Sequence, residues 1–174
     1  SWNSIIAAYE QNNDPITALE LFNAMQLLGI QPDFLTLVSL ASILAQLSDS
    51  EKSKSVHGFI LRRDWFVEDV VIGNAVVDMY AKLGAIDSAR TVFEGLPTKD
   101  AVSWNTLITG YAQNGHASEA IEVYRMMQQC EEIIANHGTW VSILPAYTHV
   151  GALQQGMKVH GRVIKNRLYS DVFV

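Results

Sequence analysis

The sequence has little of what several common classes of protein require. Cys130 is the only cysteine among 174 residues, which excludes a disulfide framework and a zinc site built from thiolates. No apolar stretch approaches the roughly 20 residues of a transmembrane helix, although the hydrophobic fraction of 49% is ample for a core. No signal or transit segment stands at the start of the sequence. These features disfavour disulfide-rich and membrane-spanning classes.

Basic residues are also scarce. The formal charge is −6, from 12 Lys and Arg against 18 Asp and Glu. No basic residue precedes Lys52, and four of the twelve gather near the C-terminus, at Lys158, Arg162, Lys165 and Arg167. Nucleic-acid binding favours Lys and Arg because they neutralise phosphates. Composition alone therefore counts against a nucleic-acid ligand.

The residues of common catalytic centres are missing. None of the five histidines begins a His-x-Glu sequence and no Cys-x-x-Cys is present, so a zinc deaminase centre is lacking. The sequence also has no phosphate-binding glycine loop and no nucleophile elbow. We therefore expect no catalytic residue, no metal and no cofactor in this stretch.

What the sequence does contain is an internal repeat with a period of about 102 residues. Each of the following recurs 102 positions later: Trp2-Asn3, Tyr9, Gln11-Asn12, Ala18, Glu20 and Met25-Gln26. A second series is displaced by 103: Val38-Ser39 and Val56-His57-Gly58 recur as Val141-Ser142 and Val159-His160-Gly161. A fixed period indicates an array of similar units, whose function lies on a surface that many units build.

Shorter helix pairs make up each long period. Apolar residues at helical spacing predict two successive helices: Trp104, Leu107, Ile108 and Tyr111, then Ala120, Val123, Tyr124 and Met127. Asn114-Gly115 separates the two helices. In the first unit Pro15 suits the start of the second helix and Gly29 its end, while Pro145 should kink or weaken the helix that contains it.

Such units stack because one helix pair cannot bury both of its apolar faces. We expect an all-α fold, an α-solenoid of antiparallel helix pairs wound as a right-handed superhelix, in one array over 1–174. The predicted units are 1–33, 34–69, 70–100, 101–136 and 137–171, with the start of another at 172–174. Since Ser1-Trp2 lies inside a repeat, we expect a piece of a longer chain whose exposed apolar ends favour self-association.

At these residues the chain resembles the pentatricopeptide repeat (PPR) family, and its plant PLS subclass in particular. The resemblance rests on Ser-Trp-Asn-Ser-Ile-Ile-Ala-Ala-Tyr from Ser1, Ser-Trp-Asn-Thr-Leu-Ile-Thr-Gly-Tyr from Ser103 and Gly-Ile-Gln-Pro-Asp from Gly29. Asn-Ala-Val-Val-Asp-Met-Tyr from Asn74 resembles the short S type, and Val-His-Gly at 56 and 159 the long L type. The units then follow the order P, L, S, P, L.

The resemblance implies a role for two residues of each repeat, the fifth and the last. In that family each repeat faces one base of single-stranded RNA, and these two side chains recognise it. The implied base-recognition residues are Asn3 with Asp33, Asn74 with Asp100, and Asn105 with Asn136. Asn-Asp resembles a uracil pair and Asn-Asn a cytosine or pyrimidine pair, whereas Val38 with Asp69 and Val141 with Asp171 match no code. The implied preference is 5′-U-N-U-Y-N-3′.

Two further positions follow from the resemblance. Val71 and Val102, second in their units, would sandwich the bases. The thirteenth residue, often a phosphate-binding Lys in the family, is Lys82 in only one unit; the others have Gln11, Gln46, Gln113 and His149. This departure implies weak affinity for RNA.

The residues also permit a plainer interpretation. Asn near a helix start and Asp at a repeat end are ordinary capping or first-turn residues. We expect a single-stranded RNA-binding segment of a mitochondrial or chloroplast protein in RNA editing or processing, with its transit peptide outside these residues and organellar protein factors as further partners. The alternative is a helical scaffold that binds proteins, which the acidity and the uncoded units favour.

Overall fold

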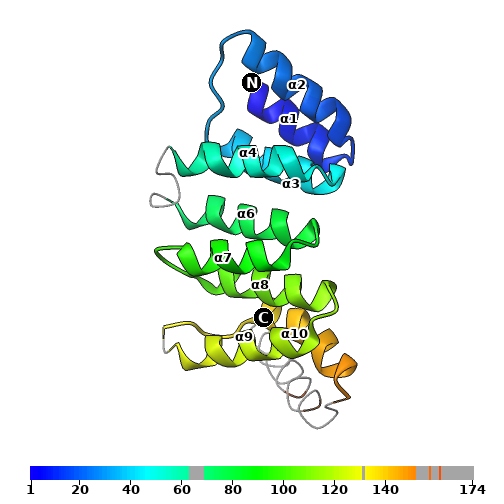
Figure 1. Cartoon of the computed structure of the whole chain (residues 1–174), viewed down its shortest axis with the longest axis vertical. Helices are drawn as coiled ribbons and strands as arrows, with labels where there is room; N and C mark the ends of the chain where they lie inside the picture. Colours follow the sequence, from blue (N-terminus) through cyan, green and yellow to red (C-terminus); the bar gives the residue numbers. More distant parts are fainter. Residues whose placement is uncertain (63–68, 131, 152–156, 158–160, 162–174) are drawn as a thin grey trace, which may run out of the picture. The chain divides into compact units, whose positions relative to one another are not determined.

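The computed structural model describes residues 1–62, 69–130, 132–151, 157 and 161. Figure 1 shows helices as the only regular elements of this described part of the chain. They are α1 (Trp2–Gln11), α2 (Pro15–Leu27), α3 (Phe34–Leu47), α4 (Ser50–Leu61), α6 (Val70–Lys82), α7 (Ile86–Gly95), α8 (Ala101–Gln113), α9 (Ala117–Gln129) and α10 (His137–His149). The predicted all-α class is confirmed, while the second helix expected in 137–171 lies outside the described residues.

The chain divides into two compact units, each larger than one predicted repeat: the first unit is Ser1–Lys99 and the second unit is Asp100–Val174. The division falls within one residue of the predicted boundary between repeats 70–100 and 101–136. Each unit is built from consecutive helix pairs. Within the described residues, no helix is both long and apolar enough to cross a bilayer.

Turn chemistry ends the helices where the sequence predicts. Asn13 between α1 and α2 has a φ of 57°, and the Asp14 side chain then accepts a hydrogen bond from the Thr17 N–H at 3.2 Å. Pro15 follows as the first residue of α2, where its missing N–H costs nothing. Gly29 comes two residues after the end of α2 with a φ of 72°, a conformation that glycine adopts without a Cβ clash.

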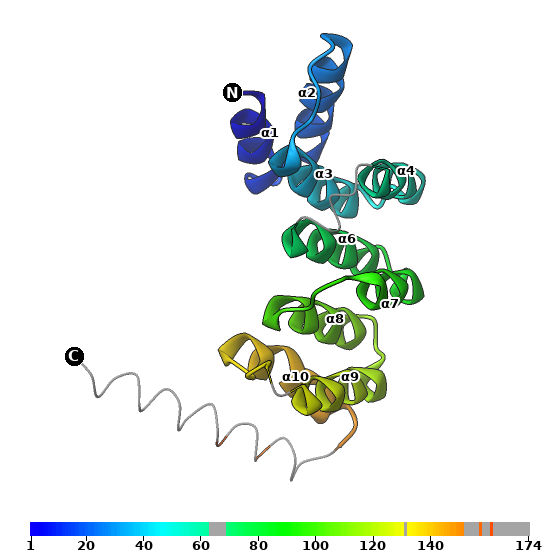
Figure 2. The same cartoon turned by 90° about the vertical axis from the view of Figure 1, so that its left-hand side faces the viewer.

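Helix α3 forms the centre of the first unit. It packs against α1, α2, α4 and α6. Its side chains Leu40, Ile43 and Leu44 are each at most 1% exposed. Figure 2 shows the first helices α1, α3 and α6 following one another, with the second helices α2, α4 and α7 to one side. Because neighbouring pairs cover both faces of α3, the pairs depend on one another for their apolar burial.

The second unit uses aromatic residues in the same way. Trp104 of α8 and Trp140 of α10 are 6% and 4% exposed, which confirms their predicted place in the core. Tyr124 of α9 meets Trp140 edge to face, with ring centroids 6.2 Å apart. Pro145 lies inside α10 without ending it, since the helix continues to His149.

The position of α3 leads to a prediction about stability. Replacement of Ile43 by Ala should lower the free energy of unfolding by about 2–5 kcal/mol, because the site is enclosed from several sides and leaves a cavity. The exposed Leu27→Ala is the matched control, with an expected change within about 0.5 kcal/mol. Urea unfolding followed by circular dichroism measures both. Equal effects of the two substitutions would contradict the central position of α3.

A histidine joins α4 to α6. The Nδ1 atom of His57 lies 3.1 Å from the Tyr80 hydroxyl oxygen, and the two rings meet edge to face at 5.5 Å. Burial lowers the pKa of His57 below its ordinary 6.5, because desolvation disfavours the imidazolium. His57 of the recurring Val-His-Gly thus packs between two helices.

The lowered pKa gives a pH dependence of stability with a definite sign. Below about pH 6.5 the unfolded chain protonates His57 while the folded chain holds it neutral, so the stability due to His57 is present above this pH and lost as pH falls. The free energy of unfolding of the wild-type chain should therefore drop more between pH 7.5 and 5.5 than that of His57→Phe. Urea titrations at both pH values measure the difference, and parallel pH profiles would contradict it.

Candidate nucleic-acid interface

The first predicted recognition pair, Asn3 and Asp33, is joined by direct hydrogen bonds. The Asn3 Nδ2 group of α1 donates to Asp33 Oδ2, although 30 residues separate them in sequence. The other carboxylate oxygen, Asp33 Oδ1, accepts the Thr36 backbone N–H at 2.9 Å. The Thr36 hydroxyl lies 2.6 Å from Asn3 Oδ1 and donates to it. Two side chains predicted to act together are thus held together by the stacking of α1 on α3.

The second pair, Asn105 and Asn136, is also in contact. Asn105 Nδ2 donates to Asn136 Oδ1 at 3.3 Å, and the same oxygen accepts the Thr139 backbone N–H at 3.1 Å. Asn105 Oδ1 is buried and has no hydrogen-bond partner in the described residues. Gly138 allows the close approach, because a Cβ there would lie 3.2 Å from both Asn105 Nδ2 and Asn136 Oδ1.

The third predicted pair is divided between the two compact units. Asn74 lies in α6 of the first unit and is only 7% exposed. Asp100 begins the second unit and caps α8, accepting the Ser103 N–H at 2.8 Å. The two residues therefore occupy the expected places in their own units, and their pairing stays a prediction.

The capping interpretation of the last repeat residue is confirmed. Four described last residues of repeats each precede a helix and accept a backbone N–H of its first turn with their side chain: Asp33, Asp69, Asp100 and Asn136. Capping does not exclude a second role. Asp33 caps with one oxygen and accepts the Asn3 amide with the other. Asp33, the last residue of the repeat 1–33, thus contacts the first helix of its own repeat while it caps the first helix of the next.

Exposed apolar side chains stand beside these polar residues. Val71 and Val102, expected to sandwich bases, are 47% and 56% exposed although both lie in first turns of helices. Leu35, at the same second position of its unit, is 63% exposed. Leu35 was not among the residues predicted to sandwich bases, although its place as the second residue of 34–69 identifies it. In the L repeat 137–171 the second residue is Gly138, so this position has no side chain there.

The first helices carry almost no charge. Within the described first helices α1, α3, α6, α8 and α10, Glu10, Asp78 and Lys82 are the side chains other than histidine that can ionise near neutral pH. Lys82, the expected phosphate contact, pairs with Asp78 at 2.6 Å. An exposed pair four residues apart is worth only about 0.3–0.5 kcal/mol and is screened by salt, so Lys82 can still exchange this partner for an anion.

A carboxylate lies beside Gln46, one of the thirteenth residues that depart from the lysine common in the family. Glu10 Oε1 accepts from the Ser42 hydroxyl at 2.5 Å and from Gln46 Nε2 at 3.3 Å. Gln46 is the thirteenth residue of its unit, where the family resemblance implies a lysine. The negative charge of Glu10 next to Gln46 disfavours a phosphate there.

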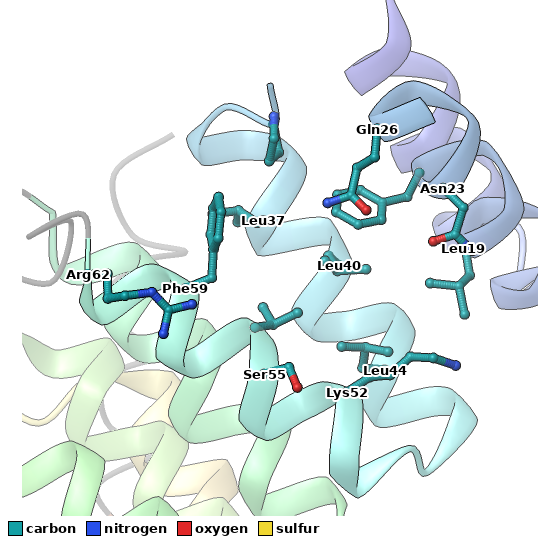
Figure 3. Close-up of a pocket in the computed structure, with 13 residues that line it drawn as sticks. Leu19, Asn23, Gln26, Leu37, Leu40, Leu44, Lys52, Ser55, Phe59 and Arg62 are labelled. Atoms are coloured by element: carbon teal, nitrogen blue, oxygen red, sulfur yellow. The ribbon is translucent and has the colours of Figure 1, made fainter. Parts of the chain in front are cut away.

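A pocket of about 290 Å³ lies elsewhere in the first unit, between α2 and α4 on the surface of α3. Figure 3 shows Leu37, Leu40 and Leu44 along its floor and Phe59 with Arg62 at one side. The pocket is the gap left where two second helices diverge. None of the expected recognition residues lines it, so it is separate from the recognition pairs.

Metal chemistry finds no support in the described ranges. They contain no group of three or more His, Cys, Asp or Glu side chains able to hold a metal ion. The polar groups that the fold assembles are amides, hydroxyls and single carboxylates. Such groups suit hydrogen-bond recognition of a neutral base edge.

Two segments of the chain match the family model of the PPR repeat, residues 1–30 and 102–131. The chain is 64% identical over 174 residues to the Arabidopsis thaliana pentatricopeptide repeat-containing protein At4g33990, covering 100% of the chain and 21% of that protein. It is 37% identical over 171 residues to At3g09040, mitochondrial, of the same plant, covering 98% of the chain and 16% of that protein. The names of these relatives describe repeat proteins and state no catalytic activity.

Solved structures show the same fold. The chain matches the pentatricopeptide repeat protein PPR10 in complex with an 18-nt psaJ RNA element, with a TM-score of 0.74, 23% identity and coverage of 94% of this chain and 25% of that one. It matches PPR10 from maize with a TM-score of 0.64, 24% identity and coverage of 97% and 24%. The chain thus spans about a fifth of the length of the relatives. Its repeated helix pairs, the two matched segments and these relatives place it in the pentatricopeptide repeat family.

Proposed function

We propose that this chain binds single-stranded RNA, with one repeat facing one nucleotide, and that it prefers 5′-U-N-U-Y-N-3′. The proposal extends to the larger protein, which would use such recognition in RNA editing or processing in a mitochondrion or chloroplast. Relatives named mitochondrial and chloroplastic support an organellar place. The order P, L, S, P, L of a plant PLS-class protein, implied for this chain by the resemblance, belongs to the same proposal.

The observation that carries the proposal is the contact within two recognition pairs. Residues chosen by their register, about 30 positions apart, form hydrogen bonds in each unit: Asn3 with Asp33, and Asn105 with Asn136. The second position of a repeat carries an exposed apolar side chain, as at Leu35 and Val102. PPR10, which shares the fold, was solved in complex with RNA. Repeated polar pairs with an apolar neighbour suit unstacked bases, which single-stranded RNA offers.

The chemistry of the pairs fits pyrimidines. A carboxamide has both donors and acceptors, and the Watson–Crick edge of uracil or cytosine presents both. Asp33 can only accept hydrogen bonds when ionised, so it directs the Asn3 amide group toward itself and leaves a defined donor and acceptor for a base. Asn136 is neutral, so it places no negative charge beside the Asn105 amide. The difference supports a uracil preference for the first pair and a broader pyrimidine preference for the second.

The scarcity of positive charge on the first helices determines the affinity for RNA that we expect. The described first helices carry a single lysine, paired with Asp78, and the carboxylate of Glu10 lies beside Gln46 at another thirteenth position. Phosphate neutralisation supplies much of the affinity of nucleic-acid complexes. We therefore expect weak binding by this stretch, with preference arising from base contacts. The same scarcity of cations is the observation that favours the alternative, a scaffold for protein partners.

Substitutions in the two pairs test the proposal at separate nucleotides. Asn3→Ala should relax the preference at the first nucleotide of 5′-U-N-U-Y-N-3′ and Asn105→Ala at the fourth, each by about 1–3 kcal/mol if base-edge contacts are comparable with those in other complexes. Asn23→Ala, an exposed amide on α2, is the matched control. Fluorescence anisotropy with labelled RNA and stepwise base changes, at low salt, measures the preference. Equal affinity for every sequence, or no binding at low salt, would instead favour the scaffold.

The charge arrangement around Gln46 gives a second prediction. The double variant Glu10→Gln, Gln46→Lys should bind RNA more tightly and show a salt slope larger by about 0.7, the value for one added phosphate contact on a single strand. Gln46→Lys alone should gain less, because Glu10 would pair with the new lysine. Ser118→Lys on α9 has the same change in net charge as Gln46→Lys alone and, in the background Glu10→Gln, the same change as the double variant. Salt-dependent anisotropy measures all three; an equal gain for Ser118→Lys would place the phosphates elsewhere.

A further inference from the structure

Thr36 stands out among the residues around the recognition pairs. Its side chain is fully buried, and its hydroxyl lies 2.6 Å from Asn3 Oδ1 and 2.8 Å from Asp33 Oδ1. It therefore touches both members of the first pair. None of the roles considered above for the fifth, last, second or thirteenth position of a repeat includes this third residue.

The hydrogen-bonding capacity of the three groups fixes which atom faces which. Asp33 as a carboxylate only accepts, so the Asn3 amide must turn its Nδ2 group toward it. Asn3 Oδ1 then points at Thr36, and the single hydroxyl proton of Thr36 satisfies it. The opposite orientation of Asn3 would set Oδ1 against the carboxylate. Asp33 Oδ1 already has a donor, the Thr36 backbone N–H.

The equivalent hydroxyls in the second unit, those of Ser103 and Thr139, also contact the side chain of their own capping residue, at 2.9 and 3.3 Å, but their further partner differs. Ser103 and Thr139 each accept the backbone N–H of the capping residue, at 3.1 Å in both cases, and so close a capping box. Helix α3 has no such box, and its hydroxyl reaches back to the preceding repeat. Accordingly Asn105 is held at one end only, by a 3.3 Å bond, and its Oδ1 lacks a partner within the described residues.

We propose that Thr36 is a positioning residue for the first recognition pair, holding the Asn3 carboxamide in one orientation so that this pair distinguishes uracil from cytosine. The inference rests on the proposed RNA function and adds a residue to it. Uracil presents a donor at N3 and an acceptor at O4, while cytosine presents an acceptor at N3 and a donor at N4. A carboxamide whose oxygen and nitrogen are both held by neighbours presents its donor and acceptor in one order, which matches only one of the two bases. A carboxamide that is free to turn can present either order and matches both bases.

The test uses one variant that removes the hydroxyl and one that keeps it. Thr36→Val should reduce the uracil-to-cytosine discrimination at the first nucleotide by about two-fold to tenfold, the range expected for one hydrogen bond. Thr36→Ser should retain it. The matched control is Thr17→Val, since Thr17 likewise lies three residues after a capping aspartate, Asp14, but on the second helix α2. RNA binding by anisotropy and the urea midpoint are measured for all three.

Each result has a meaning. Loss of discrimination in Thr36→Val alone, with a urea midpoint like that of Thr17→Val, supports the positioning role. Unchanged discrimination in Thr36→Val overturns it while leaving the RNA function intact, and equal loss in Thr36→Ser overturns it too. If the wild-type chain shows no discrimination at this nucleotide, the proposed function has failed instead.

A measurement without RNA separates the two ideas further. The side-chain amide signals of Asn3 in ¹⁵N NMR spectra, assigned by their disappearance in Asn3→Asp, report whether the carboxamide is held. We expect restricted motion in the wild-type chain and in Thr36→Ser, and increased motion in Thr36→Val. A mobile Asn3 amide in the wild-type chain would overturn the positioning role whatever the RNA experiments give.

Discussion

The structure depends on one constraint, that a helix pair has two apolar faces and can cover only one of them by itself. Helix α3 shows the consequence, since its buried leucines contact the helix pair before it and the pair after it. Stacking that hides these side chains also fixes the register between successive pairs. That register brings Asn3 to Asp33 and Asn105 to Asn136 across about 30 residues. The polar contacts are therefore a result of apolar packing.

The polar groups assembled in this way are mostly neutral. Amides and hydroxyls line the first turns of the first helices, and Glu10 adds a negative charge beside Ser42 and Gln46 of α3. Recognition by such groups would contribute selectivity with little electrostatic attraction. The chain spans about a fifth of its relatives, and an affinity shared among many weak units suits an array in which each unit adds a contact to those already made.

Sequence patterns predicted the helices and their ends well, because those features are local. The breaks at Asn12–Asp14, Ser48–Ser50 and Asn114–Gly115 follow from turn residues, and the described helices end beside them. The last residues Asp33, Asp69, Asp100 and Asn136 are helix caps, as the capping interpretation predicts, whereas their role in base recognition, implied by the family resemblance, stays a prediction. The division of the chain into two units at Asp100 was not anticipated as a division, although a repeat boundary was placed there.

Other parts of the site could not be predicted from the sequence. The contact of Thr36 with Asn3 and that of Glu10 with Gln46 both join first helices of neighbouring repeats. Whether such side chains meet depends on the offset and rotation of one helix against the next, which no local pattern encodes. Thr36 and Thr139 hold equivalent positions yet their hydroxyls face different partners, so residue type alone does not decide the contact.

The capping role of the last repeat residue limits how these proteins can change. Asp33, Asp69, Asp100 and Asn136 each begin a helix, and replacing such a cap by alanine costs about 0.5–2 kcal/mol. Only Asn, Asp, Ser, Thr and, less well, Gly serve there. Under the proposed recognition, any change of base preference at this position is therefore restricted to a few residue types, each of which must also start the helix that follows it.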